Sequence, residues 1–361
     1  MAETFYSIDT GRHHQRTPTV PNINASRRKP RRWPLVLRFI KGAIHGAILL
    51  PVFLHALFTI LIVYIDQNLD HNLGLPASII PSLSIVVGLM LVFRNQTSYN
   101  RFWDGRNYLT TVITCVRNLT RSFLVCSHNS TTPPTPVELA DTERTARILL
   151  AIIYATKNHL RAEWGSYIVP GSSTPTDTSP LLVDTTTLSL RPEYSGLVPK
   201  GLRGFEGDGL GLPLELTFLV EGYIKRGVER GWFNAPQGSQ LTVQLNTLMD
   251  AYGKMETIRL TPIPVAHLIH QKQVLALFGC VLPFALVDDM GWYAVPIVML
   301  VIFTLYGIEG IGCQLEDPFG YDRNDIKMDY IIADAAVEWG VCFEEWKKAK
   351  NAREMFMREQ I

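Results

Sequence analysis

The side chains of this chain that could carry chemistry do not form a catalytic motif. The sequence has no Gly-x-Ser-x-Gly, no His-Glu-x-x-His and no cysteine–histidine pair at a recognisable spacing. Its five cysteines are scattered and form no Cys-x-x-Cys. Several glycines between 201 and 211 could suggest a phosphate loop, but no Lys-Ser or Lys-Thr follows them. We therefore expect neither an enzyme nor a nucleic-acid-binding protein.

Ile85, Leu89 and Phe93 form a regular apolar pattern, which we call the apolar stripe. On an α-helix these residues drift by only about 80° while the helix rises about 12 Å, so they share one face. For a single helix, this spacing by itself favours packing against a neighbouring helix. The alternative is a face turned toward a cavity, and the element that carries the stripe decides between them.

The stripe lies in an apolar run, 75–93, that contains no charged residue. A helix needs about 20 apolar residues to span the hydrocarbon of a bilayer, so this run is long enough to cross one. The runs 43–65 and 292–308 also lack Asp, Glu, Lys and Arg. A fourth run, 264–287, starts with polar residues that must lie at the interface or face a bundle interior. Each run alone also fits a buried core helix, but together they predict four membrane spans.

Composition and charge placement agree with a multi-pass membrane protein that has a sizeable water-exposed part. Hydrophobic residues make up 47% and charged residues 19% of the chain, with a mean hydropathy of +0.10. Lys and Arg crowd the segment 27–41, whereas the loops 66–72 and 288–291 contain none. The positive-inside rule therefore puts both termini in the cytoplasm. The basic cluster also fits a nuclear signal or part of a transit sequence.

Outside the four runs the sequence predicts helices joined by polar loops. The segment 166–213 is rich in Gly, Pro, Ser and Thr, which is typical of a long mobile loop. We divide the chain into a basic tail, 1–32, and an all-α membrane domain, 33–361. Its cytosolic helices are expected within 94–259 and 309–357, with helical patterns at 137–164, 214–232, 240–259 and 325–357.

Four sequence blocks occur in an order that points to a known family. The block 93–106 begins Phe-Arg-Asn and ends Arg-Phe-Trp-Asp-Gly-Arg; it is followed by Thr-Pro-Ile-Pro at 261–264. Leu-Pro-Phe-Ala-Leu-Val-Asp at 282–288 and Glu-Asp-Pro-Phe-Gly at 316–320 come next. In this combination the chain resembles a bestrophin, the anion-channel family that includes bacterial and fungal members. The resemblance runs from about Trp33 to the region of Cys342.

The resemblance implies a homopentamer with four membrane helices per subunit and a helical cytosolic portion around one axial pore. Alignment on Phe93 and Arg101 puts the stripe, Ile85, Leu89 and Phe93, at the family's hydrophobic neck and Ile263 at its cytosolic aperture. Five copies of each residue would make stacked apolar rings. Such rings strip or exclude water and can gate by dewetting, so weakly hydrated anions should cross more readily than strongly hydrated ones.

Chloride and other monovalent anions are the ligands that the resemblance implies, with the lipid bilayer and further copies of the chain as partners. The second span begins near Pro76 and Pro81, so the positive end of its helix dipole would meet an incoming anion. Ser78, Ser82 and Ser84 lie at this end, and Lys272 would add positive potential inside. A cation-permeable pore of the same fold and a non-conducting membrane scaffold remain the alternatives.

Calcium is the one cofactor that the resemblance suggests. Gln314, Asp317, Asp322 and Asp325 match, position by position, a calcium clasp of animal bestrophins that N-terminal backbone completes. Clustered carboxylates suit a hard cation. However, relatives that need no calcium also carry acidic residues here, and Asp-Pro-Phe-Gly alone is consistent with a helix stop and a turn.

Overall fold

The computed structural model describes residues 44–68, 73–127, 134–163, 166–167, 189–190, 192–199 and 210–359. The predicted basic tail, 1–32, and most of the predicted loop, 166–213, lie outside these residues. The chain divides into two compact units, Met1–Gly46 and Ala47–Ile361. The description below concerns the second unit, which carries almost all of the described residues.

The described part of the chain is helical apart from one short strand pair. Its α-helices are α2 (His45–Asn68), α3 (Ile79–Cys126), α4 (Pro136–Leu160), α5 (Leu212–Glu229), α6 (Ala235–Leu260), α7 (Val265–Met290), α8 (Ala294–Leu315) and α9 (Met328–Glu359). The short elements are β1 (Ser166–Tyr167), β2 (Ser189–Leu190) and the 3-10 helices η3 (Pro192–Tyr194) and η5 (Gly291–Tyr293). β1 and β2 pair antiparallel, with Ser166 opposite Leu190. An all-α fold was the expectation, and this pair is a small addition to it.

Three helical segments among the described residues are long and apolar enough to cross a membrane. They are His45–Asn68, Ile79–Cys126 and Val265–Leu315, with 24, 48 and 51 residues. The predicted span 75–93 is only the first part of α3, which continues without a break to Cys126. The third segment contains both remaining predicted spans, because α7 and α8 follow each other with only η5 between them.

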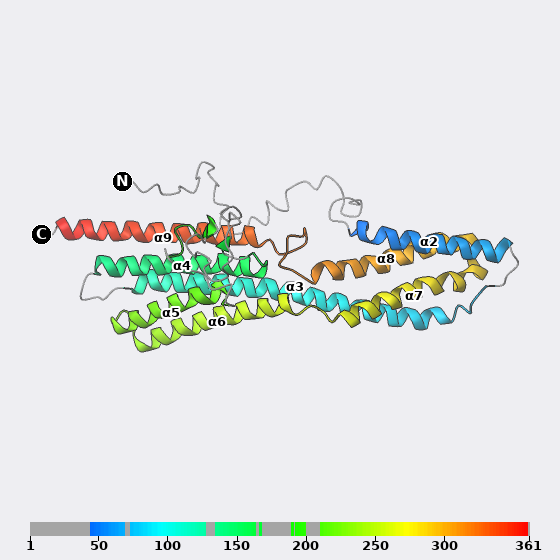
Figure 1. Ribbon diagram of the computed structural model, residues 1–361, viewed down its shortest axis with the longest axis horizontal. Helices are drawn as coiled ribbons and strands as arrows, with labels where there is room; N and C mark the ends of the chain where they lie inside the picture. Colours follow the sequence, from blue (N-terminus) through cyan, green and yellow to red (C-terminus); the bar gives the residue numbers. More distant parts are fainter. Residues whose placement is uncertain are drawn as a thin grey trace, which may run out of the picture. The chain divides into compact units, whose positions relative to one another are not determined.

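The turn between α7 and α8 reverses the chain. Gly291 has a φ of +49°, a left-handed conformation that L side chains rarely adopt and glycine tolerates. Beyond it α8 folds back along α7, so that Phe278 and Leu282 of α7 share a buried core with Ile302 of α8. Figure 1 shows the two helices side by side, next to α2 and the first part of α3.

Two hydrophobic cores lie along α3. The first holds Val87 and Leu91 of α3 against α7, α8 and α2. The second is larger and packs Leu109, Leu119 and Phe123, all fully buried, against α4, α5, α6 and α9. At a rise of 1.5 Å per residue α3 is about 72 Å long, which lets one helix contribute to both cores. Figure 1 shows α3 passing from one group of helices to the other.

Local sequence signals fix where two helices of the second core begin. Thr135 caps α4 through a reciprocal pair of hydrogen bonds with Glu138. Asn234 caps α6 in the same way with Gln237. A proline in the first turn follows each cap, where its missing N–H costs nothing. The first capping box starts α4 at Pro136, one residue before the predicted 137, and the second starts α6 at Ala235, five residues before the predicted 240.

Candidate functional site

The apolar stripe is exposed on the subunit. Ile85, Leu89 and Phe93 are 70%, 54% and 61% exposed, although they lie in the middle of an apolar helix. The stripe therefore does not pack against a helix of its own subunit, which was one of the two interpretations open from the sequence. It must face lipid, another subunit or an aqueous pathway.

Polar residues continue the stripe at both ends along the same face of α3. Ser78 and Ser82 precede it, and Gln96 and Asn100 follow it; all four are exposed. At 100° per residue, these positions and the stripe fall within about 80° of one another around the helix. Gln96 Nε2 donates to Asn100 Oδ1 at 2.9 Å, which holds the two amides on this face. The face thus reads polar, apolar and polar along its length.

The opposite face of α3 is packed. Val87, Leu91, Arg94 and Ser98 are all buried, and they fall on the side of the helix turned away from the stripe. Val87 and Leu91 belong to the core with α7 and α8. The two faces of α3 are thus distinct: the face with Val87 and Leu91 packs against the interior of the subunit, and the face with the stripe does not.

Two arginines attach α3 to the segment that follows α8. The buried Arg94 donates from Nη2 to Cys313 Sγ at 3.0 Å and lies 3.4 Å from the Glu316 carboxylate. The guanidinium of Arg101 donates hydrogen bonds to three backbone carbonyls: Glu316 at 2.9 Å, Thr261 at 2.7 Å and Ile258 at 2.6 Å. These contacts fix the register of α3, and so the height of the stripe, relative to α6 and α8.

Ile263 does not share the exposed face. Its side chain is 8% exposed in the subunit, and its backbone N–H donates to Glu316 Oε1 at 3.4 Å. The residue lies between α6 and α7, close to the carbonyls that Arg101 holds. Its assignment to an aperture stays a prediction.

Lys272 does not stand as an unpaired charge at the start of α7. Its Nζ lies 3.7 Å from the Glu309 carboxylate of α8, although the lysine side chain is 61% exposed. The two charges partly cancel. Lys272 alone is therefore a weaker source of positive potential than the sequence suggested.

Two of the four residues of the predicted calcium clasp are engaged with partners outside it. Asp317 pairs with Arg259 at 2.8 Å, and Gln314 Oε1 accepts from Asn324. Asp325 Oδ2 accepts the Asp322 N–H at 2.7 Å, which closes the turn after Asp-Pro-Phe-Gly. The described residues contain no group of three or more acidic, histidine or cysteine side chains that could hold a metal ion. As placed, these side chains do not fit a calcium shell.

The turn that carries Asp317, Asp322 and Asp325, which we call the acidic turn, has one feature that is compatible with a bound cation. Asp325 Oδ1 is buried and has no hydrogen-bond partner within the described chain. Burial raises the pKa of the Asp325 carboxyl, and the charges of Asp322 and Asp317 raise it further against the lowering effect of the Asp322 N–H. An unpartnered oxygen beside other carboxylates is unfavourable, so Asp325 is where any calcium effect should be sought.

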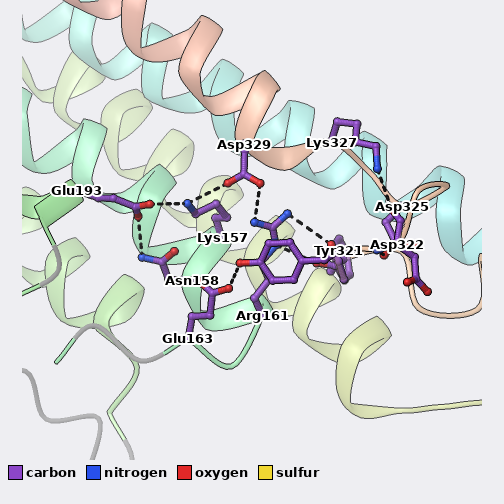
Figure 2. Close-up of polar contacts among 12 residues, drawn as sticks. Lys157, Asn158, Arg161, Glu163, Glu193, Tyr321, Asp322, Asp325, Lys327 and Asp329 are labelled. Carbon is purple, nitrogen blue, oxygen red and sulfur yellow. Dashed lines mark hydrogen bonds and ion pairs between the residues drawn. The ribbon is translucent and has the colours of Figure 1, made fainter. Parts of the chain in front are cut away.

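An ion-pair network that was not predicted lies beside this turn, with its two cations buried and the Asp329 side chain 57% exposed (Figure 2). Lys157 of α4, 5% exposed, lies 2.9 Å from Glu193 and 3.2 Å from Asp329. Arg161, one helical turn further on, pairs with the same Asp329 at 2.8 Å and covers the Tyr321 ring at 4.0 Å. The network joins η3, α4, the acidic turn and α9 through groups that are far apart in the sequence.

Asp329 is the shared acceptor of this network. Burial raises its pKa, but the hydrogen bonds and charges of Arg161 and Lys157 outweigh burial and hold the pKa below its ordinary value. The i, i+4 spacing of Lys157 and Arg161 was the available signal. This spacing fits an exposed basic face near a helix C-terminus equally well, because cations are common there.

The helical architecture and its apolar segments define the class: the chain is a helical integral membrane protein. Residues 24–340 match the family model for bacterial/fungal bestrophin protein, and the chain belongs to this family. The resemblance found in the sequence blocks is thus confirmed at the level of the family.

Relatives of known name span most of the chain. A voltage-dependent anion channel-forming protein of Nostoc sp. is 35% identical over 304 residues, 83% of this chain and 88% of the relative. A protein of the same description from Synechocystis sp. is 33% identical over 306 residues, 84% and 89% of the two chains. The structure of a bacterial bestrophin homologue from Klebsiella pneumoniae shares the fold, with a TM-score of 0.63 at 24% identity over 81% and 97% of the two chains.

Proposed function

We propose that this protein is a pentameric anion channel whose apolar stripe forms the neck of an axial pore. The names of its Nostoc and Synechocystis relatives support an anion-channel activity, and the family is one of channels rather than enzymes. Chloride is the anion proposed.

The observation that carries the proposal is the composition of one face of α3. The stripe is exposed on the subunit, and exposed polar residues continue its line at both ends. Ser78 and Ser82 lie within the apolar run 75–93, where a face that only meets lipid has no need for hydroxyls, and the Gln96–Asn100 pair continues the same line into the part of α3 beyond the run. A water-filled pathway with one apolar constriction needs all three parts, because ions require polar surroundings before and after a dewetting neck.

A pore of this kind requires several subunits. One stripe presents only a single wall, so closed rings need copies of α3 related by a rotational axis. The family resemblance makes the number five. Light scattering with refractive-index correction on the detergent-purified protein measures the mass directly. A monomer or a dimer as the only species would contradict the proposed neck.

Four crossings per subunit are part of the proposal. The segment Val265–Leu315 has 51 residues, which would be about 76 Å long as one straight helix, more than twice the thickness of the hydrocarbon. Because α8 folds back along α7, each of the two fits a separate crossing. With α2 and the first part of α3, this puts both termini on the same side, the cytoplasm by the charge rule.

Anion preference is supported by the beginning of α3. The helix starts at Ile79 with Ser78 at the cap, so its positive dipole end lies at the mouth of the proposed pathway, although the N–H groups of Ile79 and Ile80 already donate to the carbonyls of Pro76 and Ala77. Ser82 adds a hydroxyl on the stripe face. Lys272 contributes less because of Glu309. The Ile263 aperture and the calcium clasp stay predictions that this proposal does not need.

Planar-bilayer recording of the purified protein in asymmetric chloride tests the function. An anion channel gives a reversal potential near the chloride equilibrium potential, and replacing chloride with thiocyanate should raise the current because thiocyanate is more weakly hydrated. A reversal potential near that of sodium would identify a cation pore of the same fold. Intact protein without conductance under any voltage would favour the scaffold alternative.

A further inference from the structure

A cavity of about 480 Å³ lies between α3, α4 and α9, well along α3 from the stripe. Its wall is mainly apolar and comes from the second core, with Val116 of α3, Ile153 of α4 and Ala335 of α9 among its residues. The volume falls in the range of about 300–1,000 Å³ that is typical of small-molecule sites. Figure 1 shows α3, α4 and α9 next to one another.

Two polar atoms in the wall are buried without a partner. Thr120 is 4% exposed, and its Oγ1 has no hydrogen-bond partner within the described chain; the same holds for Nε1 of Trp339. Both residues line the cavity. Trp339 is held in place because its ring stacks on Phe343 with centroids 4.7 Å apart. Buried polar groups are nearly always hydrogen-bonded, so two orphan donors in one wall indicate a missing acceptor.

The charge of the wall is positive. Arg117 and Arg121 both line the cavity, and Arg117 is neutralised by an ion pair with Glu338. Arg121 is exposed and makes no ion pair with any residue of the described chain. A guanidinium fork binds a carboxylate in a bidentate way. The cavity thus combines an apolar body, two orphan donors and one uncompensated arginine.

We propose that this cavity binds a small amphiphilic carboxylate from solution, with its apolar part against Ile153 and Ala335 and its carboxylate toward Arg121. Charge argues against the N-terminal segment of the chain as the occupant, since that segment carries a basic cluster at 27–41. The site is separate from the proposed pore and does not depend on the ion that the channel passes.

The full-length protein in nanodiscs of zwitterionic lipid tests this with dodecanoate as the probe. Cys342 is exposed and lines the cavity, so the rate of its alkylation by a maleimide, followed by peptide mass spectrometry, reports occupancy. Tryptophan fluorescence gives a second readout through Trp339 and Trp346. Dodecanol controls for partitioning into the lipid, because it has the same chain without the charge.

We expect dodecanoate to slow the alkylation of Cys342 at concentrations at least about tenfold below those of dodecanol. Arg121→Gln should lower the affinity for dodecanoate by about tenfold. Arg144→Gln, at an exposed arginine of α4 outside the cavity wall, should leave this affinity unchanged. Ala335→Leu should fill the cavity and remove binding without lowering the unfolding temperature.

Four results would overturn the site. Equal affinity for dodecanol, or unchanged affinity in Arg121→Gln, would mean that the carboxylate is not recognised. Binding that survives Ala335→Leu would mean that the probe lies elsewhere. A Cys342 thiol that resists alkylation without any probe would show that another copy or another part of the chain covers the cavity.

Discussion

Arg101 Nε donates to the backbone carbonyl of Glu316 at 2.9 Å, across 215 residues of sequence. The same guanidinium holds two carbonyls at the end of α6, and the carboxylate of Glu316 pairs with Arg94. Arg94 and Arg101 of the block 93–106 are therefore both engaged within the subunit. The hydrogen bonds of Arg101 form a bracket that joins α3, α6 and the end of α8 beyond the Phe93 end of the stripe.

Replacing Arg101 should release this bracket. Arg101→Gln leaves three carbonyls short of a donor, and we expect the free energy of unfolding to fall by about 3 kcal/mol, the contribution of one or two hydrogen bonds to a charged group, because an exposed carbonyl regains a hydrogen bond from water. Thermal unfolding in detergent measures the change. Arg106→Gln is the matched control, because Arg106 donates to the Thr110 hydroxyl within its own helix. Equal effects of the two variants would contradict the bracket.

Gly105 should not tolerate a side chain. A Cβ at this position would lie 2.9 Å from Phe319 Cζ, and Phe319 is fully buried in the second core. Gly105→Ala should therefore destabilise the protein by about 1–3 kcal/mol, the typical cost of overpacking. Phe319→Leu removes the clashing ring edge, so the double variant should recover part of the stability that Gly105→Ala loses. Gly253→Ala, where a Cβ meets nothing within 4 Å, is the control.

Removing the stripe should change the current and not the fold. Ile85, Leu89 and Phe93 are exposed on the subunit, so changing all three to Ala should cost the subunit little stability. A wider and less apolar neck should raise conductance and reduce the preference for thiocyanate over chloride, both measured in planar bilayers. Intact pentamers with unchanged conductance and selectivity would contradict the assignment of these three residues to the neck of a pore.

The packed face of α3 supplies the contrast for that experiment. Leu91 is 3% exposed and belongs to the core with α7 and α8, so Leu91→Ala should cost about 2–5 kcal/mol. We expect less folded protein from this variant and an unchanged anion preference in whatever folds. If the triple stripe variant instead loses its pentamer, the stripe serves packing between subunits rather than a pore.

Asp325 should make the protein less stable when it is ionised. Its pKa is raised in the folded state, mainly by burial, so the folded chain binds the proton more tightly than the unfolded chain. Stability should therefore fall as pH rises from the unfolded pKa through the raised folded pKa, and the penalty is complete above it. Asp325→Asn should raise the unfolding temperature at neutral pH in a chelator, and this gain should shrink in acid.

Asp325→Asn also tests the predicted calcium clasp. If the clasp forms, calcium should raise the unfolding temperature of the native chain and not that of Asp325→Asn, by preferential binding to the folded state. Asp334→Asn, at an exposed aspartate of α9, controls for the loss of one negative charge. No response of the native chain to calcium would leave the acidic turn with a structural role.

The sequence by itself determined the class of protein and its family. A helix that spans a membrane needs a long apolar run, and such runs can be read directly from the sequence. The four predicted runs lie within four helices or directly beside their ends: 43–65 in α2, 75–93 in α3, 264–287 in α7 and 292–308 in α8. The capping residues Thr135 and Asn234 act within one helical turn; α4 begins one residue before the predicted 137, whereas α6 begins at Ala235, five residues before the predicted 240. The spacing of the stripe put its three residues on one face for the same local reason.

Only the tertiary structure decided what each face meets. Periodicity cannot say which side of α3 is packed; the contacts of Val87 and Leu91 with α7 and α8 do, and they leave the stripe exposed. The roles of Arg101, Lys157 and Asp329 depend on partners about 150 to 220 residues away or on distant turns, and sequence spacing carries no record of such pairings. Ile263 is buried away from the exposed face, Asp317 pairs with Arg259 and Asp325 accepts the Asp322 N–H, because side chains in a packed fold contact whichever neighbour the backbone brings within reach.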